Sequence, residues 1–298
     1  MMGKREGKSH QKWEWAEESD ELIRGISGGF LFGIPLLYTM EVWWIGSYSK
    51  ASMRLVALAI TYLVVFFFNR TAGFRRNQDI EMRWRDTAME SVEAIAIGLV
   101  SATVVLILLR QIDIHTPLNE ALGKAIFEGL PFSLGVALAT SLMSGDRFEL
   151  NLENNNTKGN STKPTEIENN LADLGATLIG AIFIAFNIAP TDEVPMLAAA
   201  SSSPWQIAVV VSSLLISYCI VFAAGFRGQK RRYKQRGVFQ DPLGETLICY
   251  LVSLGASVVM LWFFQKLNFS DPWQIWLNHS IILGLPAAVG GAAGRLAV

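Results

Sequence analysis

The stretch RDTAMESVEAIAIGLVSATVVLILL, residues 85–109, and its near-copy QDPLGETLICYLVSLGASVVMLWFF, residues 240–264, decide the fold of this chain. Each is an apolar run of the length that crosses a bilayer as a helix. Each begins with two acids, Asp86 and Glu90 in the first run and Asp241 and Glu245 in the second. The acids recur at a constant offset of 155 residues, which suggests two copies of one membrane unit.

Other motifs recur in the same order. Upstream of the apolar runs, Gly28 matches Gly180 and the tetrapeptide AGFR at 72–75 matches AGFR at 224–227, both at an offset of 152 residues. Downstream, at 155 residues, the tripeptide GLP at 129–131 returns at 284–286. Apolar helices resemble one another by composition, which would explain matching leucines. That alternative does not explain separate polar and glycine motifs in register, so we predict an internal duplication.

Composition indicates a membrane protein. Hydrophobic residues make up 51% of the 298 residues, charged residues only 17%, and the mean hydropathy is +0.32. A net charge of −1 gives no bulk attraction to nucleic acid. The two cysteines, Cys219 and Cys249, lie within apolar runs and are expected to be small buried side chains rather than a disulfide. The first 20 residues are polar and lack the pattern of a secretory signal peptide.

The hydropathy pattern predicts an all-α polytopic membrane protein with about eight transmembrane helices, arranged as two parallel four-helix repeats. The expected spans are Leu22–Trp44, Leu55–Phe68, Thr87–Leu109, Leu122–Met143, Leu171–Ala189, Trp205–Phe226, Leu243–Phe264 and Ile275–Ala293. We expect a cytoplasmic N-terminal tail (1–21), a first repeat (22–144), a flexible cytoplasmic linker (145–170) and a second repeat (171–298). The linker is rich in Asn, Thr, Lys and Glu and has too few apolar residues to form a packed core.

The distribution of lysine and arginine predicts the orientation. If the N-terminus is cytoplasmic, twenty of the 25 basic residues fall in cytoplasmic segments and five in outside loops. Both termini are then cytoplasmic. Because each repeat has an even number of spans, the repeats enter the membrane from the same side and are expected to be related by a pseudo-two-fold axis along the membrane normal.

The stretch GGFLFGIPLLYTMEVWW at 28–44 and AGFR at 72–75, together with the acids at the start of the third span, resemble a bacterial family of integral membrane proteins with a domain of unknown function. The resemblance covers nearly the whole chain apart from the tail and the linker. It implies a multi-pass protein of the bacterial inner membrane. It implies no activity, substrate or site residues.

Carboxylates within the spans are the main functional candidates, since ionisable groups inside a membrane are costly. The candidate ion-pathway residues are Glu41, Asp86, Glu90, Glu128, Glu193, Asp241 and Glu245. Their oxygens suit H⁺, Na⁺, Mg²⁺ or Ca²⁺, but the pattern does not identify a metal. We expect a site between the halves, lined by Glu90 and Glu245, with Glu41 and Glu193 at its outside mouth.

Structural explanations for the same residues remain open. Asp86 and Asp241 could cap the N-termini of their helices, and Glu90 and Glu245 suit the positive end of the helix dipole. Glu128 has an apolar counterpart in the second half, and Lys124, one turn away, is its expected partner. The basic loops could bind anionic lipid headgroups through Arg75, Arg76, Arg231 and Arg232, or could only fix the topology.

No motif for zinc, serine-hydrolase or nucleotide chemistry is present, so we expect neither an enzyme nor a cofactor. The favoured function is a cation channel or ion-coupled transporter. The alternative is a membrane scaffold or lipid-interacting protein that transports nothing. The expected partners are membrane lipids and an inorganic cation, without nucleic acid, and a homo-oligomer is left open.

Overall fold

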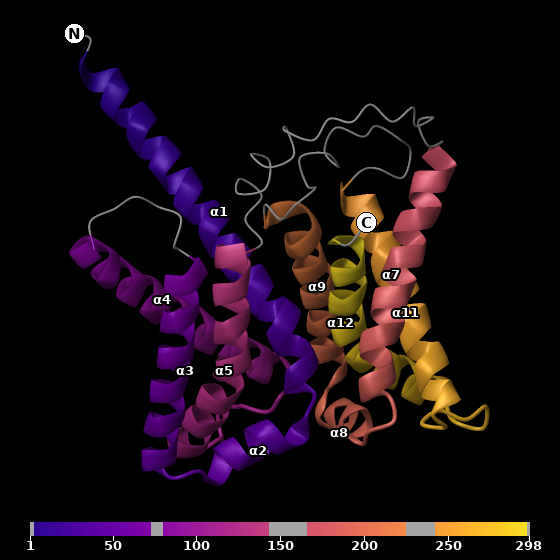
Figure 1. Cartoon of the computed structure of the whole chain (residues 1–298). Helices are drawn as coiled ribbons and strands as arrows, with labels where there is room; N and C mark the ends of the chain where they lie inside the picture. Colours follow the sequence, from indigo (N-terminus) through magenta and orange to yellow (C-terminus); the bar gives the residue numbers. More distant parts are fainter. Residues whose placement is uncertain (1–2, 73–79, 143–165, 225–241, 297–298) are drawn as a thin grey trace.

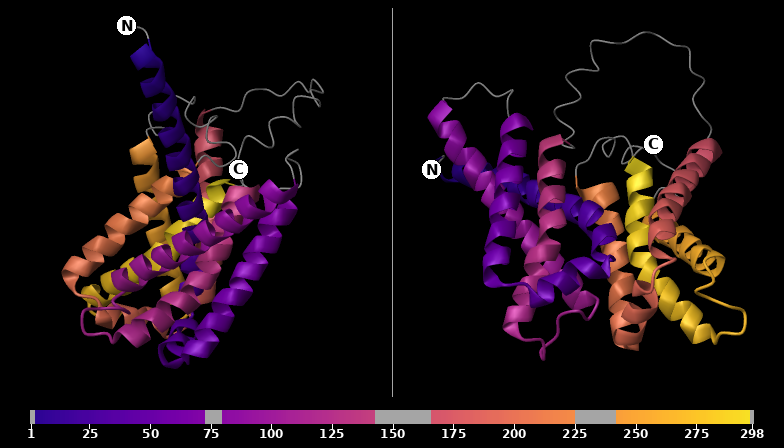
Figure 2. Two further views of the ribbon diagram at one scale, coloured as in Figure 1. Left: turned by 90° about the vertical axis from the view of Figure 1, so that its left-hand side faces the viewer. Right: turned by 60° about the horizontal axis from the view of Figure 1, so that its bottom comes forward.

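The computed structural model describes residues 3–72, 80–142, 166–224 and 242–296, and within these ranges it contains helices and no strand. The first half contains α1 (Gly3–Leu37), α2 (Met40–Tyr48), α3 (Ala51–Ala72), α4 (Ile80–Leu108) and α5 (Leu118–Leu142). The second half contains α7 (Glu166–Ile188), α8 (Glu193–Ala200), α9 (Ser203–Tyr218) with the π-helical turn η2 (Cys219–Ala223), α11 (Pro242–Phe263) and α12 (Trp273–Leu296). The two groups of helices stand side by side (Figures 1 and 2).

Both halves have the same order of elements, with one short helix second in each. The short helices α2 and α8 lie at the same end of the molecule, which we call the short-helix end, and both chain termini lie at the opposite, terminal end (Figure 1). Within the described residues, seven helices are long and apolar enough to cross a membrane, and the bent pair α1–α2 makes an eighth if it counts as one broken span. The expected all-helical fold with about eight spans is therefore confirmed.

The first span is not the single helix over Leu22–Trp44 that its hydropathy predicts. It breaks after Leu37, and α2 leaves at 87° to the axis of α1. Thr39 forms the corner, because its hydroxyl group donates to the Leu36 carbonyl at the end of α1 while its own carbonyl accepts from the N–H of Val42 in α2. Hydropathy averages over a window and cannot detect a corner between two apolar segments.

The long helices end alike in the two halves. α4 and α11 each finish with a residue in the left-handed conformation, Arg110 and Gln265, both with φ of 60°. The next N–H then returns to a carbonyl five residues earlier, from Gln111 to Leu106 at 2.8 Å and from Lys266 to Leu261 at 2.9 Å. This is the hydrogen-bond pattern of a Schellman motif, which closes the helix end.

Glycines bring equivalent helices into close contact. α1 packs on α5 and α7 packs on α12. A Cβ atom added to Gly28 would collide with the carbonyl of Gly135, and one added to Gly180 would collide with that of Gly290. Small residues at such crossings let helix backbones approach closely in a membrane.

The contact between the halves, in contrast, joins helices that do not correspond. α1 packs against η2 and α12, whereas the corresponding pairs, α7 with α3 and α7 with α5, are not among the packed helix pairs of the described residues. Arg24 donates to the Ala224 carbonyl at 3.0 Å, and the hydroxyl of Tyr38 donates to the Ile282 carbonyl at 2.6 Å. The packing of the described helices therefore does not follow the expected pseudo-two-fold axis.

Candidate functional site

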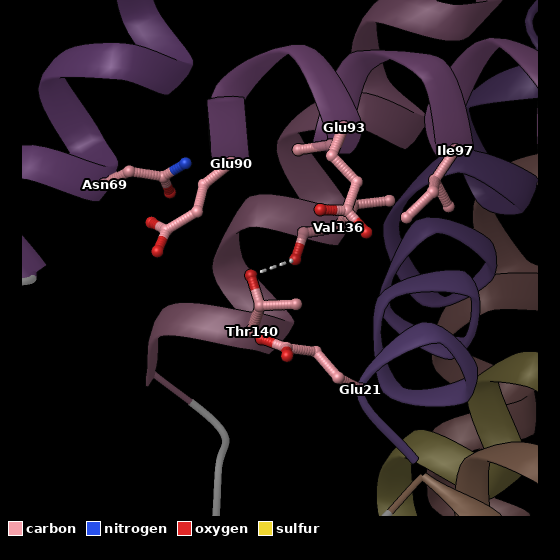
Figure 3. Close-up of a pocket in the computed structure, with 8 residues that line it drawn as sticks. Glu21, Asn69, Glu90, Glu93, Ile97, Val136 and Thr140 are labelled. Atoms are coloured by element: carbon pink, nitrogen blue, oxygen red, sulfur yellow. Dashed lines mark hydrogen bonds between the residues drawn. The ribbon is translucent and has the colours of Figure 1, made fainter. Parts of the chain in front are cut away.

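A pocket at the terminal end of the first half is lined by three acids, of which Glu90 is a predicted ion-pathway residue (Figure 3). It lies between α1, α3, α4 and α5. Its lining consists of Glu21, Asn69, Glu90, Glu93, Ala94, Ile97, Val136 and Thr140. We call this the first-half pocket. Three carboxylates from two helices thus surround one space, and all three of these side chains are exposed.

Helical spacing places the pocket residues. Glu90 and Glu93 are three apart on α4, and residues at this spacing share a face of a helix. On α5, Val136 and Thr140 are four apart and line the opposite wall. Asn69, at the end of the α3 span, is tied to α4 because its amide donates to the Ser91 hydroxyl at 3.3 Å. Glu90 also has an interaction partner of its own.

Asp86 does not line the pocket, although it lies one turn before Glu90. It is exposed, and α4 begins at Ile80, so Asp86 lies inside the helix rather than at its N-terminus. The interpretation of Asp86 as an N-terminal cap is therefore wrong, and Glu90 lies too far along α4 to interact with the first turn. Hydropathy does not reveal this, because the six residues before Asp86, IEMRWR, alternate apolar with charged side chains and so do not extend the apolar run.

In the second half, Glu245 forms an ion pair with Arg295 near the end of α12. Glu245 lies in the first turn of α11, as expected. The Arg295 guanidinium group is buried and lies 5.6 Å from the centroid of the Phe222 ring. Arg295 was not a predicted site residue. The signal that the sequence offers is a basic residue at the end of the last apolar run, where it also fits the excess of basic residues expected on the cytoplasmic side.

The pocket and the ion pair occupy corresponding places. Glu90 corresponds to Glu245 and Thr140 to Arg295, each at an offset of 155 residues. Where the second half holds a guanidinium group, the first half holds a threonine beside an open pocket.

The structure does not bring Glu90 and Glu245 together. Glu90 faces a pocket lined only by the first half, and Glu245 is paired within the second half. The expected cavity between the halves, lined by both acids, is therefore wrong. The prediction assumed that equivalent helices face each other, whereas α1 of the first half packs against η2 and α12 of the second.

Glu41 and Glu193 lie at the short-helix end, in the first turns of α2 and α8. Their surroundings differ, since Glu41 is exposed and Glu193 is only 8% exposed. One carboxylate oxygen of Glu193, Oε2, has no hydrogen-bond partner among the described residues. Neither acid lines the first-half pocket.

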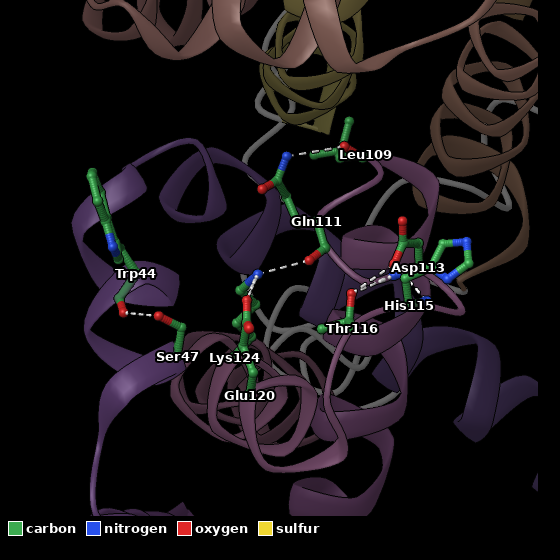
Figure 4. Close-up of polar contacts among 9 residues, drawn as sticks. All are labelled: Trp44, Ser47, Leu109, Gln111, Asp113, His115, Thr116, Glu120 and Lys124. Carbon is green, nitrogen blue, oxygen red and sulfur yellow. Dashed lines mark hydrogen bonds and ion pairs between the residues drawn. The ribbon is translucent and has the colours of Figure 1, made fainter.

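Glu128 is fully buried in the middle of α5, and neither of its carboxylate oxygens has a hydrogen-bond partner among the described residues. The expected partner, Lys124, points elsewhere. Its ammonium group lies 2.6 Å from the carboxylate of Glu120 and donates to the Gln111 carbonyl at 2.9 Å (Figure 4). Lys124 is four residues from both acids, and it pairs with the one nearer the surface.

Some candidates cannot be placed. Asp241, Arg75, Arg76, Arg231 and Arg232 lie outside the described residues. Within the described residues, no three His, Cys, Asp or Glu side chains gather closely enough to hold a metal ion. The acids of the first-half pocket therefore do not form a preformed site for a dehydrated metal ion.

The long apolar helices define this protein as a polytopic α-helical integral membrane protein. The chain belongs to the family described as "Putative integral membrane protein (DUF2391)", whose model matches residues 21–298. The match includes every helix from the membrane part of α1 to α12 and begins at Glu21 of the first-half pocket. No curated protein and no solved structure matches the chain.

Proposed function

We propose that this protein carries cations across the membrane, as a channel or an ion-coupled transporter, and that the first-half pocket is its cation-binding site. The observation that carries the proposal is the convergence of Glu21, Glu90 and Glu93 on one pocket. Acidic clefts with low-dielectric walls concentrate cations by focusing the electric field. Because the pocket has no preformed metal cluster among the described residues, the cation binds with part of its hydration shell.

The second half supports this proposal, because it holds a cationic group at the place that corresponds to the first-half pocket. At the corresponding place, a cationic side chain, Arg295, is paired with the counterpart of Glu90. The first half has Thr140 in place of this arginine, together with open space and the additional acid Glu93, whose counterpart is Ile248. The open first-half pocket and its three carboxylates can attract a cation even though Glu90 has an interaction partner.

The proposal includes an evolutionary and topological part. The two halves derive from one duplicated four-span unit, inserted in parallel into the bacterial inner membrane with both termini in the cytoplasm. Supporting features are the shared order of elements, the matching helix ends at Arg110 and Gln265, and the matching glycine contacts. The first-half pocket then opens towards the cytoplasm, and the basic loops next to it contact anionic lipids.

Cation flux into proteoliposomes tests the transport function. We expect the wild type to conduct at least one of a panel of monovalent and divalent cations, and the double variant Glu90→Gln, Glu93→Gln to lose most of that flux. Asp86→Asn is the matched control, because Asp86 is an exposed acid of the same helix outside the pocket. Absence of flux with every cation, or equal flux in the double variant, would reject the proposal.

A second candidate is a lipid-interacting protein without transport. It is favoured by Arg70 at the end of α3, whose guanidinium group lies 4.0 Å from the centroid of the exposed Trp84 ring. Arginine and tryptophan together suit a membrane–water interface. Binding to vesicles of defined anionic lipid content, without cation flux, would favour this function, and Arg70→Gln should then weaken the binding.

A further inference from the structure

Glu128 is a buried acid that the proposed pocket does not use. It lies in the middle of the span Leu118–Thr140, where its side chain is 0% exposed. The backbone amide of Trp43, on α2, approaches the carboxyl group without meeting hydrogen-bond geometry. An ionised carboxylate in this position would be buried without a partner, which is among the most costly arrangements in a protein interior.

Packing does not require an acid at this position. The counterpart of Glu128 in the second half is Leu283, which is also 0% exposed. The same frame of helices therefore accepts an apolar side chain of similar size. A carboxyl group that the fold does not need, in a place where it is costly, is a functional candidate.

Glu128 belongs to a row of α5 residues spaced four apart, and successive members of such a row are neighbours on the helix surface. The row begins at the short-helix end with Glu120, whose side chain is 36% exposed, and continues with Lys124. Beyond Glu128 it reaches Phe132 and then Val136 and Thr140 of the first-half pocket. Polar side chains thus lead from the surface to Glu128, and a buried aromatic ring separates it from the pocket.

The distance from Glu128 to the first-half pocket is about 12 Å along the helix axis, from the rise of 1.5 Å per residue. Phe132 is fully buried between α5 and α1, where a Cβ atom added to Gly33 would collide with its ring. Access to Glu128 is therefore better from the short-helix end than from the pocket.

No charged group of the surrounding helices forms a hydrogen bond with Glu128 among the described residues. Helices α1, α2, α3 and α4 pack against α5. Their charged or titratable residues in the described membrane part are Glu18, Asp20, Glu21, Arg24 and Tyr38 beside α1, Glu41 and Tyr48 on α2, Arg54, Tyr62 and Arg70 on α3, and Arg85, Asp86, Glu90 and Glu93 on α4. The nearest along the sequence, Lys124 of α5 itself, is paired with Glu120.

We propose that Glu128 is a proton-binding site within the membrane, filled from the short-helix end through Glu120 and Lys124, and that it couples the cation movement proposed above to protons. The coupling role rests on the proposed function; the proton site does not. A proton from water adds to a carboxylate oxygen of Glu128 and returns to water when the site empties. When it leaves, Lys124 is the cation one turn away that can turn from Glu120 to Glu128.

Infrared spectroscopy of the full-length protein in lipid bilayers tests the proton site. A carboxyl group that carries a proton has a C=O stretching band that an ionised carboxylate lacks. We expect this band at neutral pH in the wild type, its loss in Glu128→Leu and Glu128→Gln, and its retention in the control Asp192→Asn, an exposed acid of the second half. A spectrum that is unchanged in both Glu128 variants would overturn the proposal.

Thermal stability separates this site from a structural role. Glu128→Leu reproduces the residue of the second half, so we expect a melting temperature equal to or above that of the wild type. A lower melting temperature for this variant would mean that Glu128 has a stabilising partner, and would overturn the proposal.

Flux measurements address the coupling. We expect a pH gradient to drive cation flux in the wild type, and at least a tenfold loss of that flux in Glu128→Leu, with flux down a cation gradient retained. Retained proton-driven flux in the variant would overturn the coupling role. If the wild type moves no cation at all but its infrared band still depends on Glu128, the proposed function fails and the proton site stands.

Discussion

The first and second halves place the same secondary structure around different polar groups. In the second half, Arg295 reaches from α12 to Glu245 on α11, and the ion pair fills the space between the helices. In the first half, Thr140 is too short to do so, and the space remains a pocket bordered by Glu90 and two further acids. The comparison teaches that positions which match in the sequence can hold a closed ion pair in one half and an open acidic pocket in the other, because the side chains at a few of these positions differ.

A similar contrast exists in the middle of the membrane. Glu128 and Leu283 are both fully buried at corresponding positions of α5 and α12. The polar residue is again in the first half. The second half thus provides the structural reference for the first: where it is apolar or internally paired, the first half carries groups that the fold alone does not require.

The largest expected effect on stability comes from breaking the ion pair between Glu245 and Arg295 in the second half. Arg295→Ala leaves the carboxylate of Glu245, whose side chain is 17% exposed, without its cation, and breaking a buried pair in this way costs about 3–5 kcal/mol. Chemical denaturation in detergent measures the loss. Arg85→Ala, at an exposed arginine, should change stability by less than about 0.5 kcal/mol. A loss below about 1 kcal/mol for Arg295→Ala would show that the ion pair does not hold α11 and α12 together.

The converse test is to place a cationic side chain in the first-half pocket. Thr140→Arg gives the first half the residue of the second, and its guanidinium group should occupy the pocket beside Glu90. We expect folding to be retained and cation flux to fall by roughly tenfold or more, equivalent to about 1.4 kcal/mol of lost binding. Thr140→Val is the control, because it removes the hydroxyl group without adding a charge. Equal flux in the wild type and Thr140→Arg would break the proposed correspondence.

The glycine contacts test whether the helix crossings α1–α5 and α7–α12 are equivalent in the two halves. Gly28→Ala and Gly180→Ala each force a methyl group against a backbone carbonyl, so each should destabilise the protein by about 1–3 kcal/mol. Gly175→Ala, with nothing within 4 Å of the added carbon, should stabilise it by roughly 0.5–1 kcal/mol through helix propensity. Unfolding of the three variants under one set of conditions gives the values. If only one of the first two is sensitive, the crossings are not equivalent.

The smallest effect is expected in the turn after α4. The Thr116 hydroxyl group, and next the His115 backbone N–H, hydrogen-bond to the carboxylate of Asp113 and lower its pKa. A carboxyl group with a lowered pKa in the folded state stabilises the fold above the unfolded value, about 3.9, and this stabilisation is lost as the pH falls through the folded value.

Melting temperatures between about pH 6 and pH 2 can measure the small contribution of ionised Asp113 to stability, since this range spans the usual pKa of aspartate. Asp113→Asn carries the residue found at the corresponding position 268, so it should lose the pH-dependent part and melt slightly below the wild type at neutral pH. The two curves should converge in acid. Parallel curves would mean that the hydrogen bonds do not favour the ionised form.

Much of the fold could be predicted because membrane spans are encoded locally. Apolar runs of sufficient length are visible in the sequence, and seven of the predicted spans correspond to single continuous apolar segments of the structure. The break at Thr39 could not be predicted in the same way. It depends on a side-chain hydrogen bond at the corner and on Tyr38 reaching the second half, and neither changes the hydropathy.

The candidate site was predicted only in part. Glu90 was identified from its recurrence, but Glu21, Asn69 and Thr140 were not, because each is unremarkable until helices from different parts of the chain meet. Glu128 was identified from its position within a span, whereas its partner was assigned wrongly. A lysine four residues from two acids can pair with either, and only the packing around α5 selects Glu120.

The sequence by itself determined the class of protein and the approximate spans, and it predicts which positions correspond between the halves, because hydropathy and motif spacing are properties of the chain. Only the tertiary structure decided that Glu90 faces a pocket while Glu245 is paired with Arg295, and that the halves meet mainly through α1 rather than through matching helices. The physical reason is that a side chain's environment depends on which helices pack around it, and close packing in three dimensions is not a local property of the sequence.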